Sequence, residues 1–227
     1  MSDHARTGVV VAIDGPSGSG KSSTSRGVAA RLGLRYLDTG AMYRAITWWM
    51  LEQGVPVDDP EAVAARCAEP VIASGTDPLA PTITADGVDV SEAIRSPRVT
   101  GAVSAVSAVP EVRARLLLLQ RETIDGGGIV VEGRDIGSAV APDAEVKVYL
   151  TADAGARAAR RAAEEGGSDL AATESSLLAR DRIDSTRTAS PLTMAAGAVH
   201  LDTTPYTLDE VVDLIVGWVE DRAEGPR

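Results

Sequence analysis

The stretch that decides the fold is Gly15-Pro16-Ser17-Gly18-Ser19-Gly20-Lys21-Ser22, which fits the pattern G-x-x-x-x-G-K-[ST]. It follows an apolar, β-branched run over residues 9–13, which we expect to be a buried strand, and it opens a helical pattern over residues 21–32. Glycines in such a loop let backbone N–H groups close around phosphate oxygens, and the N-terminus of the helix adds partial positive charge. The sequence therefore predicts a binding site for the phosphates of ATP or GTP.

Two side chains of this phosphate loop have predicted roles. Lys21 is expected to reach the β- and γ-phosphates, and Ser22 to bind Mg²⁺. The alternative is a flexible Gly/Ser turn between a strand and a helix. The complete motif in this context is far more typical of a nucleotide site.

Short apolar runs alternate with helical patterns along the rest of the chain. Further strands are expected around Tyr36 and over residues 129–131, 146–150 and 199–201, and helices over residues 41–53, 99–109, 111–124, 154–165, 171–185 and 208–219. Such alternation predicts an α/β fold with a parallel sheet covered by helices on both faces. Residues 69–90 differ, because short strand-like pieces surround the turn Asp86-Gly87, and they predict a small antiparallel insert.

Charge limits the partners of the protein. The chain has 33 acidic and 22 basic residues, a net charge of −11, so most of its surface should repel nucleic acid and anionic membranes. No apolar run approaches the ~20 residues that span a bilayer, and the first residues lack the pattern of a signal peptide. We expect a cytoplasmic protein, and a monomer because no apolar stripe is evident.

Three classes of protein carry such a loop. A GTPase would carry Asn-Lys-x-Asp, which is absent from the sequence, and a motor ATPase is usually larger. A small kinase remains, in which arginines hold a second anionic substrate. The alternatives left open are a kinase for another monophosphate or for a sugar acid, and a nucleotide-binding regulatory protein without transferase activity.

The chain resembles the bacterial cytidylate kinases in a series of motifs that keep the family's order over nearly its whole length. The matching pieces are Ile13 to Ser22, Leu37-Asp38-Thr39-Gly40-Ala41-Met42-Tyr43-Arg44, Glu132-Gly133-Arg134-Asp135-Ile136-Gly137, Arg157-Ala158-Ala159-Arg160-Arg161 and Arg180-Asp181-Arg182-Ile183-Asp184-Ser185-Thr186-Arg187. The first is generic among nucleotide-binding proteins, whereas Gly-Arg-Asp-Ile-Gly and Arg-Asp-x-x-Asp-x-x-Arg are much more specific.

The resemblance implies a fold and an activity. Residues 1–227 would form a single P-loop kinase domain with a five-stranded parallel sheet, a CMP-binding insert over residues 67–95 and a helical lid over residues 157–172. The enzyme would transfer the γ-phosphoryl group of ATP to CMP and dCMP, with Mg²⁺ as cofactor.

The resemblance also implies the site residues. The donor nucleotide would be bound by Gly15, Pro16, Ser17, Gly18, Ser19, Gly20, Lys21, Ser22 and Ser23. The acceptor would be bound by Thr39, Tyr43, Arg44, Ser104, Arg113, Arg134, Asp135, Arg180, Asp184 and Arg187. Catalysis would rest on Lys21, Arg134, Arg157, Arg161 and Arg187, with Arg157, Arg160 and Arg161 in the lid.

The chemistry of the acceptor fits these side chains. A carboxylate accepts a hydrogen bond from the exocyclic amine of cytosine, which uracil replaces with a carbonyl, so Asp135 would select cytosine while Ser104 and Arg113 donate to the ring. Arginine forks match phosphate oxygens in pairs, as expected of Arg44, Arg134 and Arg187, and Arg180 and Asp184 would face the ribose. The alternative for Asp135 is a turn or helix-start residue after Gly133.

Overall fold

The computed structural model describes residues 8–164, 167, 169–188 and 190–224. Contacts within the chain group these residues into two compact units, one formed by the residues up to Arg35 and from Gly126 onward, the other by Tyr36–Asp125. The boundary between the units falls within strand β2, Arg35–Asp38.

The main sheet has five strands in the order β2-β6-β1-β7-β8. Its remaining strands are β1 (Val10–Asp14), β6 (Ile129–Gly133), β7 (Val146–Thr151) and β8 (Val199–Asp202). Strand β1 is parallel to both β6 and β7, and β8 is parallel to β7. Every residue of β6 is buried, as expected of a central strand in a sheet that is covered on both faces.

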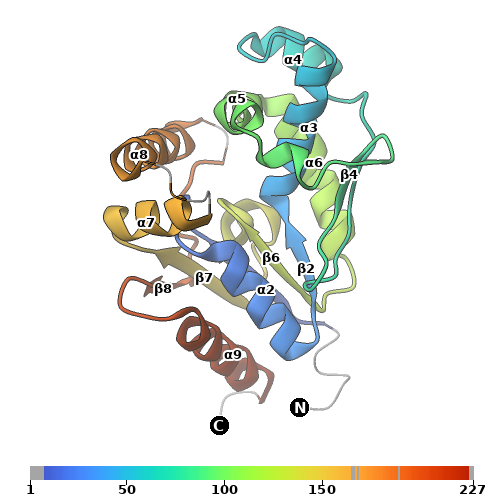
Figure 1. Ribbon diagram of the computed structural model, residues 1–227. Helices are drawn as coiled ribbons and strands as arrows, with labels where there is room; N and C mark the ends of the chain where they lie inside the picture. Colours follow the sequence, from blue (N-terminus) through green and yellow to red (C-terminus); the bar gives the residue numbers. More distant parts are fainter. Residues whose placement is uncertain (1–7, 165–166, 168, 189, 225–227) are drawn as a thin grey trace. The chain divides into compact units, whose positions relative to one another are not determined.

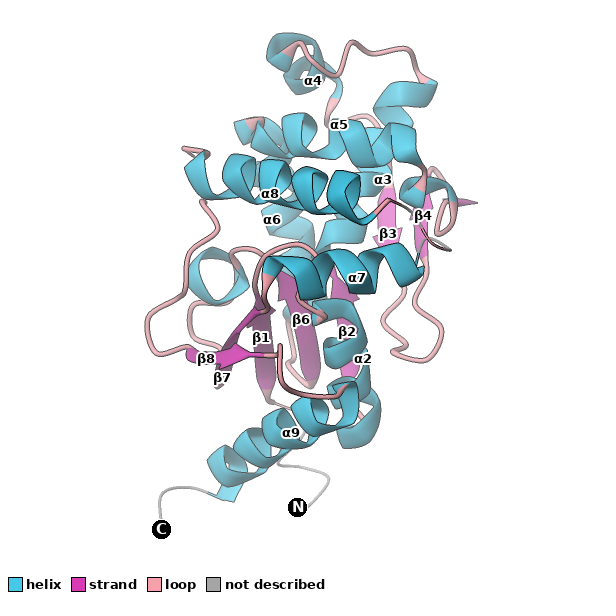
Figure 2. Cartoon of the chain, turned by 60° about the vertical axis from the view of Figure 1, so that its left-hand side comes forward, coloured by secondary structure: helices cyan, strands magenta, loops and turns pink. Residues whose placement is uncertain are grey.

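Helices α2 (Lys21–Leu32) and α9 (Leu208–Glu224) pack against each other beside this sheet (Figure 1). Gly27 permits the close approach, because a Cβ atom at this position would lie 2.7 Å from Cγ2 of Val212. Helices α7 (Ala154–Glu164) and α8 (Leu170–Thr186) form a second packed pair (Figure 2). The predicted lid, residues 157–172, covers the end of α7 and the start of α8, but its residues 165, 166 and 168 lie outside the described residues.

The second unit is built on α3 (Thr39–Glu52), which contacts α5 (Pro97–Ala108), α6 (Pro110–Ile124) and the 3-10 turn η1 (Ala93–Arg95). It also holds α4 (Pro60–Arg66) and an antiparallel sheet of β3 (Ile72–Ser74), β4 (Ile83–Ala85) and β5 (Val88–Asp89). Asp86, at a φ of 52°, turns the chain from β4 to β5, and its carboxylate accepts from the indole of Trp49 at 2.7 Å.

The structure confirms the predicted α/β fold, the five-stranded sheet and the small antiparallel sheet. Helix α4 was not predicted, although Asp59 caps it and Pro60 begins it. The five-residue π-turn η2 (Ile136–Val140) after β6 was also missed. Among the described residues, no helix combines the length and the apolar character needed to cross a membrane.

Candidate nucleotide-binding site

The phosphate loop joins the buried end of β1 to the start of α2. Its backbone needs glycine, since Gly15, Gly18 and Gly20 have φ values of 149°, 75° and 86°. A Cβ atom on Gly15 would lie only 2.1 Å from the carbonyl oxygen of Leu150 on β7. The sheet therefore holds the loop closely, and the predicted strand–loop–helix context is present.

Lys21 is buried at the first position of α2, and its ammonium donates to the carbonyl oxygen of Pro16 at 2.6 Å. Burial, and next the positive charge of Arg134, lower the pKa of Lys21 to about 7, against the opposing effect of Glu132 and other carboxylates. An anion at the loop would reverse this balance, because opposite charge favours the charged form of lysine.

A carboxylate at the end of β1 holds the segment that follows β6. Asp14, at the end of β1, accepts from the backbone N–H groups of Ile136 and Gly137, each at 2.8 Å. Burial raises the pKa of Asp14 to about 6 even though these two hydrogen bonds oppose the shift. Asp14 thereby anchors η2, the turn that follows Arg134 and Asp135.

Glu132, buried on β6, accepts from the hydroxyl of Ser22 at 2.9 Å. Neighbouring hydroxyl and carboxylate oxygens are hard ligands suited to Mg²⁺, which usually takes one or two protein oxygens and completes its shell with phosphates and water. In the part of the chain that the structure describes, no three His, Cys, Asp or Glu side chains gather into a metal site. With two neighbouring oxygen donors, Ser22 and Glu132 fit a metal ion that the phosphates of a nucleotide would also bind.

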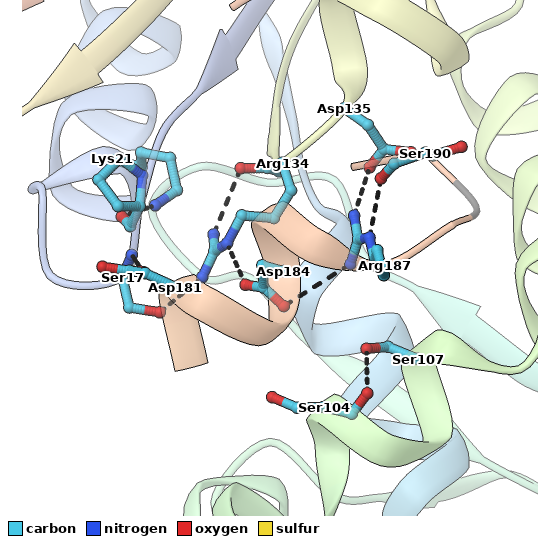
Figure 3. A network of polar contacts seen from close by, with 12 residues as sticks. Ser17, Lys21, Ser104, Ser107, Arg134, Asp135, Asp181, Asp184, Arg187 and Ser190 are labelled. Atoms are coloured by element: carbon cyan, nitrogen blue, oxygen red, sulfur yellow. Dashed lines mark hydrogen bonds and ion pairs between the residues drawn. The ribbon is translucent and has the colours of Figure 1, made fainter. Parts of the chain in front are cut away.

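Arg134 connects the phosphate loop to helix α8 (Figure 3). Its Nη2 donates to the hydroxyl of Ser17 at 2.7 Å, and its Nε donates to the carboxylate of Asp184 at 2.9 Å. Arg187 lies near two carboxylates, 3.6 Å from Asp135 and 3.7 Å from Asp184. Four predicted acceptor residues therefore form one ion-pair network beside the loop.

The remaining predicted arginines of this unit lie on α7 and α8. Arg157 is buried and pairs with Asp181, while Arg160 donates to the hydroxyl and carbonyl oxygens of Thr203, both at 2.9 Å. Burial, and next Arg134, lower the pKa of Arg180, whose Nε has no hydrogen-bond partner among the described residues. Arg161 is partly exposed on α7.

The other predicted acceptor residues belong to the second unit. The guanidinium of Arg113 lies 5.4 Å from the ring centroid of Tyr43 and donates to the carbonyl oxygen of Ser107 at 3.3 Å. Ser107 in turn donates to the carbonyl of Ser104 at 3.0 Å. Helices α3, α5 and α6 thus bring Tyr43, Ser104 and Arg113 into one cluster.

Two predicted residues of the second unit have other surroundings. Arg44 donates to the carbonyl oxygen of Ile94 at 3.0 Å and to the hydroxyl of Thr100 at 2.9 Å. Thr39 is the buried first residue of α3, whose N-terminus is capped by Asp38.

A phosphate loop with paired arginines beside it is the arrangement of a phosphoryl-transfer site, and comparison with known proteins agrees. Residues 11–221 match the cytidylate kinase family. The chain belongs to this family. Among its relatives, the cytidylate kinase of Streptomyces griseus is 60% identical over 96% of this chain and 95% of its own length. Those of Streptomyces coelicolor and Nocardia farcinica are 59% and 56% identical, over 96% and 91% of this chain and 95% and 91% of their own lengths.

The fold also resembles that of a solved structure with a very different sequence. A solved structure of an uncharacterized protein from Eubacterium ventriosum has a TM-score of 0.54 over 93% of this chain and 98% of that chain. Because the two sequences are only 10% identical, this likeness concerns the fold alone.

Sequence reasoning missed three carboxylates that support the site. Asp14, Glu132 and Asp181 all stand inside the motifs quoted above, beside residues that were assigned roles. A carboxylate directly after an apolar strand was the available signal for Asp14. For the other two, the partners lie 110 and 164 residues away in the chain.

Proposed function

We propose that the protein transfers the γ-phosphoryl group of ATP to CMP and dCMP, giving CDP or dCDP and ADP. One observation carries the proposal: Arg134 donates both to Ser17 of the phosphate loop and to Asp184 of the predicted acceptor site. A single side chain therefore contacts both the loop that would bind the donor and a residue that would bind the acceptor.

On the donor side, the backbone of residues 15–20 would surround the phosphates, and Ser23 would extend this site on α2. Lys21 would release the carbonyl of Pro16 and turn its ammonium to the β- and γ-phosphates. Lys21, Arg157 and Arg161 would then stabilise charge that develops on the transferring group, the kind of electrostatic stabilisation that contributes most in such sites.

Ser22 and Glu132 would hold Mg²⁺ together with the phosphates. When bound, the ion neutralises phosphate charge and orients the donor. The site needs no general base, because the attacking oxygen belongs to a phosphate group that is already ionised at neutral pH. Positioning and positive charge can supply most of the rate enhancement.

On the acceptor side, Arg134 and Arg187 are placed in one network, and we assign them, with Arg44, to the acceptor phosphate. Asp135 would accept from the cytosine amine, since its carboxylate is buried and lies 3.6 Å from Arg187. Thr39, Tyr43, Ser104 and Arg113 would contribute to binding the nucleoside, with Arg180 and Asp184 at the ribose.

The insert over residues 67–95 would help to bind CMP, and residues 157–172 would act as the lid. Lid closure would exclude water and so limit hydrolysis of ATP. We place the reaction in the cytoplasm, where ATP is available, and expect the enzyme to act as a monomer.

The test is to follow the label from ATP carrying a labelled γ-phosphate, mixed with Mg²⁺, CMP and purified protein. The proposal predicts label in the β-phosphate of CDP, and loss of that product in Lys21→Met. Label recovered only as inorganic phosphate would mean that the protein hydrolyses ATP without transferring to CMP, and would contradict the proposal.

A further inference from the structure

Asp181 lies on α8, and both oxygens of its carboxylate accept hydrogen bonds from other elements of the first unit. Its Oδ1 accepts from the backbone N–H of Ser17 at 3.0 Å, and its Oδ2 is paired with Nη1 of Arg157. The side chain is only 16% exposed. Figure 3 shows Asp181 beside Ser17. Together with its pairing to Arg157, this contact connects α8 to the phosphate loop and to α7.

Arg157 completes the connection from α7. Its Nη1 donates to the carbonyl oxygen of Ser17 at 2.9 Å in addition to pairing with Asp181. A Cβ atom on Gly18 would lie 3.2 Å from Cβ of Arg157, so the arginine packs directly on the loop. Asp181 and Arg157 thus hold the N–H and the carbonyl of the same loop residue.

One N–H group of the Arg157 guanidinium takes no part in these contacts with Ser17 and Asp181. Its Nε is buried and has no hydrogen-bond partner within the described part of the chain. Leaving a buried donor unpaired is unfavourable, and such a group next to a phosphate loop is suited to an oxygen of the bound nucleotide. The ion pair with Asp181 fixes which edge of the guanidinium remains available.

We propose that Asp181 is a positioning residue for phosphoryl transfer, holding Arg157 against the phosphate loop with its Nε ready for the donor phosphates. The inference rests on the proposed function and adds a residue to it. Asp181 also carries a negative charge beside an anion-binding loop, which would repel phosphate if Arg157 did not neutralise it. The pair therefore works as a unit.

The first test is Asp181→Asn, which retains the size of the side chain and an acceptor for the N–H of Ser17 but removes the charge that holds Arg157. We expect kcat to fall about 10- to 100-fold, as misplacement of a group in the site does, and KM for ATP to rise. KM for CMP should change little. Arg182→Gln, at the exposed next position of α8, is the matched control and should behave as wild type.

A second measurement separates positioning from support of the fold. Arg157→Lys retains a positive charge beside Asp181 but lacks the guanidinium, and we expect it to lose activity to a similar degree. If the two residues act as a unit, the double variant Asp181→Asn/Arg157→Lys should be about as slow as either single variant. Two results would overturn the proposal and leave Asp181 with a purely structural role. One is a loss of kcat in the double variant that equals the product of the two single losses. The other is a loss of kcat that accompanies a lower unfolding temperature.

Binding of a non-hydrolysable ATP analogue supplies a readout that does not depend on the acceptor. We expect Asp181→Asn to bind the analogue about tenfold more weakly, and Arg182→Gln to bind it normally. Wild-type protein that binds the analogue but does not phosphorylate CMP would contradict the proposed function, and the binding comparison would still test Asp181. Wild-type turnover and wild-type binding in Asp181→Asn would overturn the inference while leaving the proposed function in place.

Discussion

Lys21 should change its protonation state when a nucleotide binds. In the structure its ammonium is buried against the carbonyl of Pro16 and its pKa is lowered to about 7. Bound triphosphate adds negative charge, which raises the pKa of a lysine. At pH 8 Lys21 should thus be mostly neutral in the free enzyme and charged in the complex.

ATP binding at pH 8 should consequently take up about one proton. ATP itself is fully ionised at this pH, because the second pKa of a phosphate is about 6. Calorimetry in buffers with different ionisation enthalpies measures the uptake. Lys21→Arg is the control, since arginine stays charged in both states, and an equal uptake in that variant would assign the proton to another group.

Asp135 is the residue that should decide which base is accepted. Asp135→Asn removes the carboxylate that would repel the carbonyl of uracil, so the preference for CMP over UMP in kcat/KM should fall roughly tenfold to a hundredfold. The variant also weakens the contact with Arg187, but that change affects both acceptors alike. Asp143→Asn, at an exposed position, should leave the ratio unchanged. An unaltered ratio in Asp135→Asn would remove Asp135 from base selection.

Some residues of the site could be assigned from the sequence and others could not. Lys21 and Ser22 were assigned from the motif because the neighbours that define them are adjacent in the chain. Asp181 could not be assigned in this way, because its partner Ser17 lies 164 positions earlier. The contacts of Arg157 likewise depend on how α7 and α8 pack, which local sequence does not specify.

At the scale of elements, the loop between β1 and α2 depends on a close approach to β7. Gly15→Ala would place a methyl group 2.1 Å from the carbonyl oxygen of Leu150 at a φ of 149°. Backbone strain of this kind costs about 1–3 kcal/mol before the clash is counted, so we expect a loss of about 3 kcal/mol or more in the free energy of unfolding.

Urea denaturation measures this loss. The matched control is Gly217→Ala in α9, where a Cβ atom would meet nothing within 4 Å. This variant should be neutral or more stable by up to ~1 kcal/mol, because alanine has the higher helix propensity. Equal stability of the two variants would show that the loop is not held as described.

Most elements could be predicted because they carry a local signal. The helix over residues 21–32 was predicted with the bounds that α2 has, since the loop begins it and Gly33 ends it. Helix α4 was missed because it has only seven residues, too few for a clear periodic pattern. Strand order was out of reach, as β1 pairs with β6 and β7, more than a hundred residues later.

For the molecule as a whole, the sequence gives the net charge directly but not the positions of the charged side chains in the fold. A chain with a net charge of −11 concentrates arginines around its phosphate loop, where Arg134, Arg157 and Arg187 pair with carboxylates of the same unit. The grouping into two compact units was not foreseen, because a unit formed from two separated stretches of chain has no boundary signal in composition. The single-domain description therefore stays a prediction.

The measurement that tests the central claim most directly is a comparison of acceptors. With saturating ATP and Mg²⁺, kcat/KM would be determined for CMP, dCMP, UMP, AMP and GMP by following ADP formation. The account predicts efficient turnover of CMP and dCMP and values at least tenfold lower for the other three. Turnover of a purine monophosphate or UMP as efficient as that of CMP, or no turnover of any of the five, would contradict it.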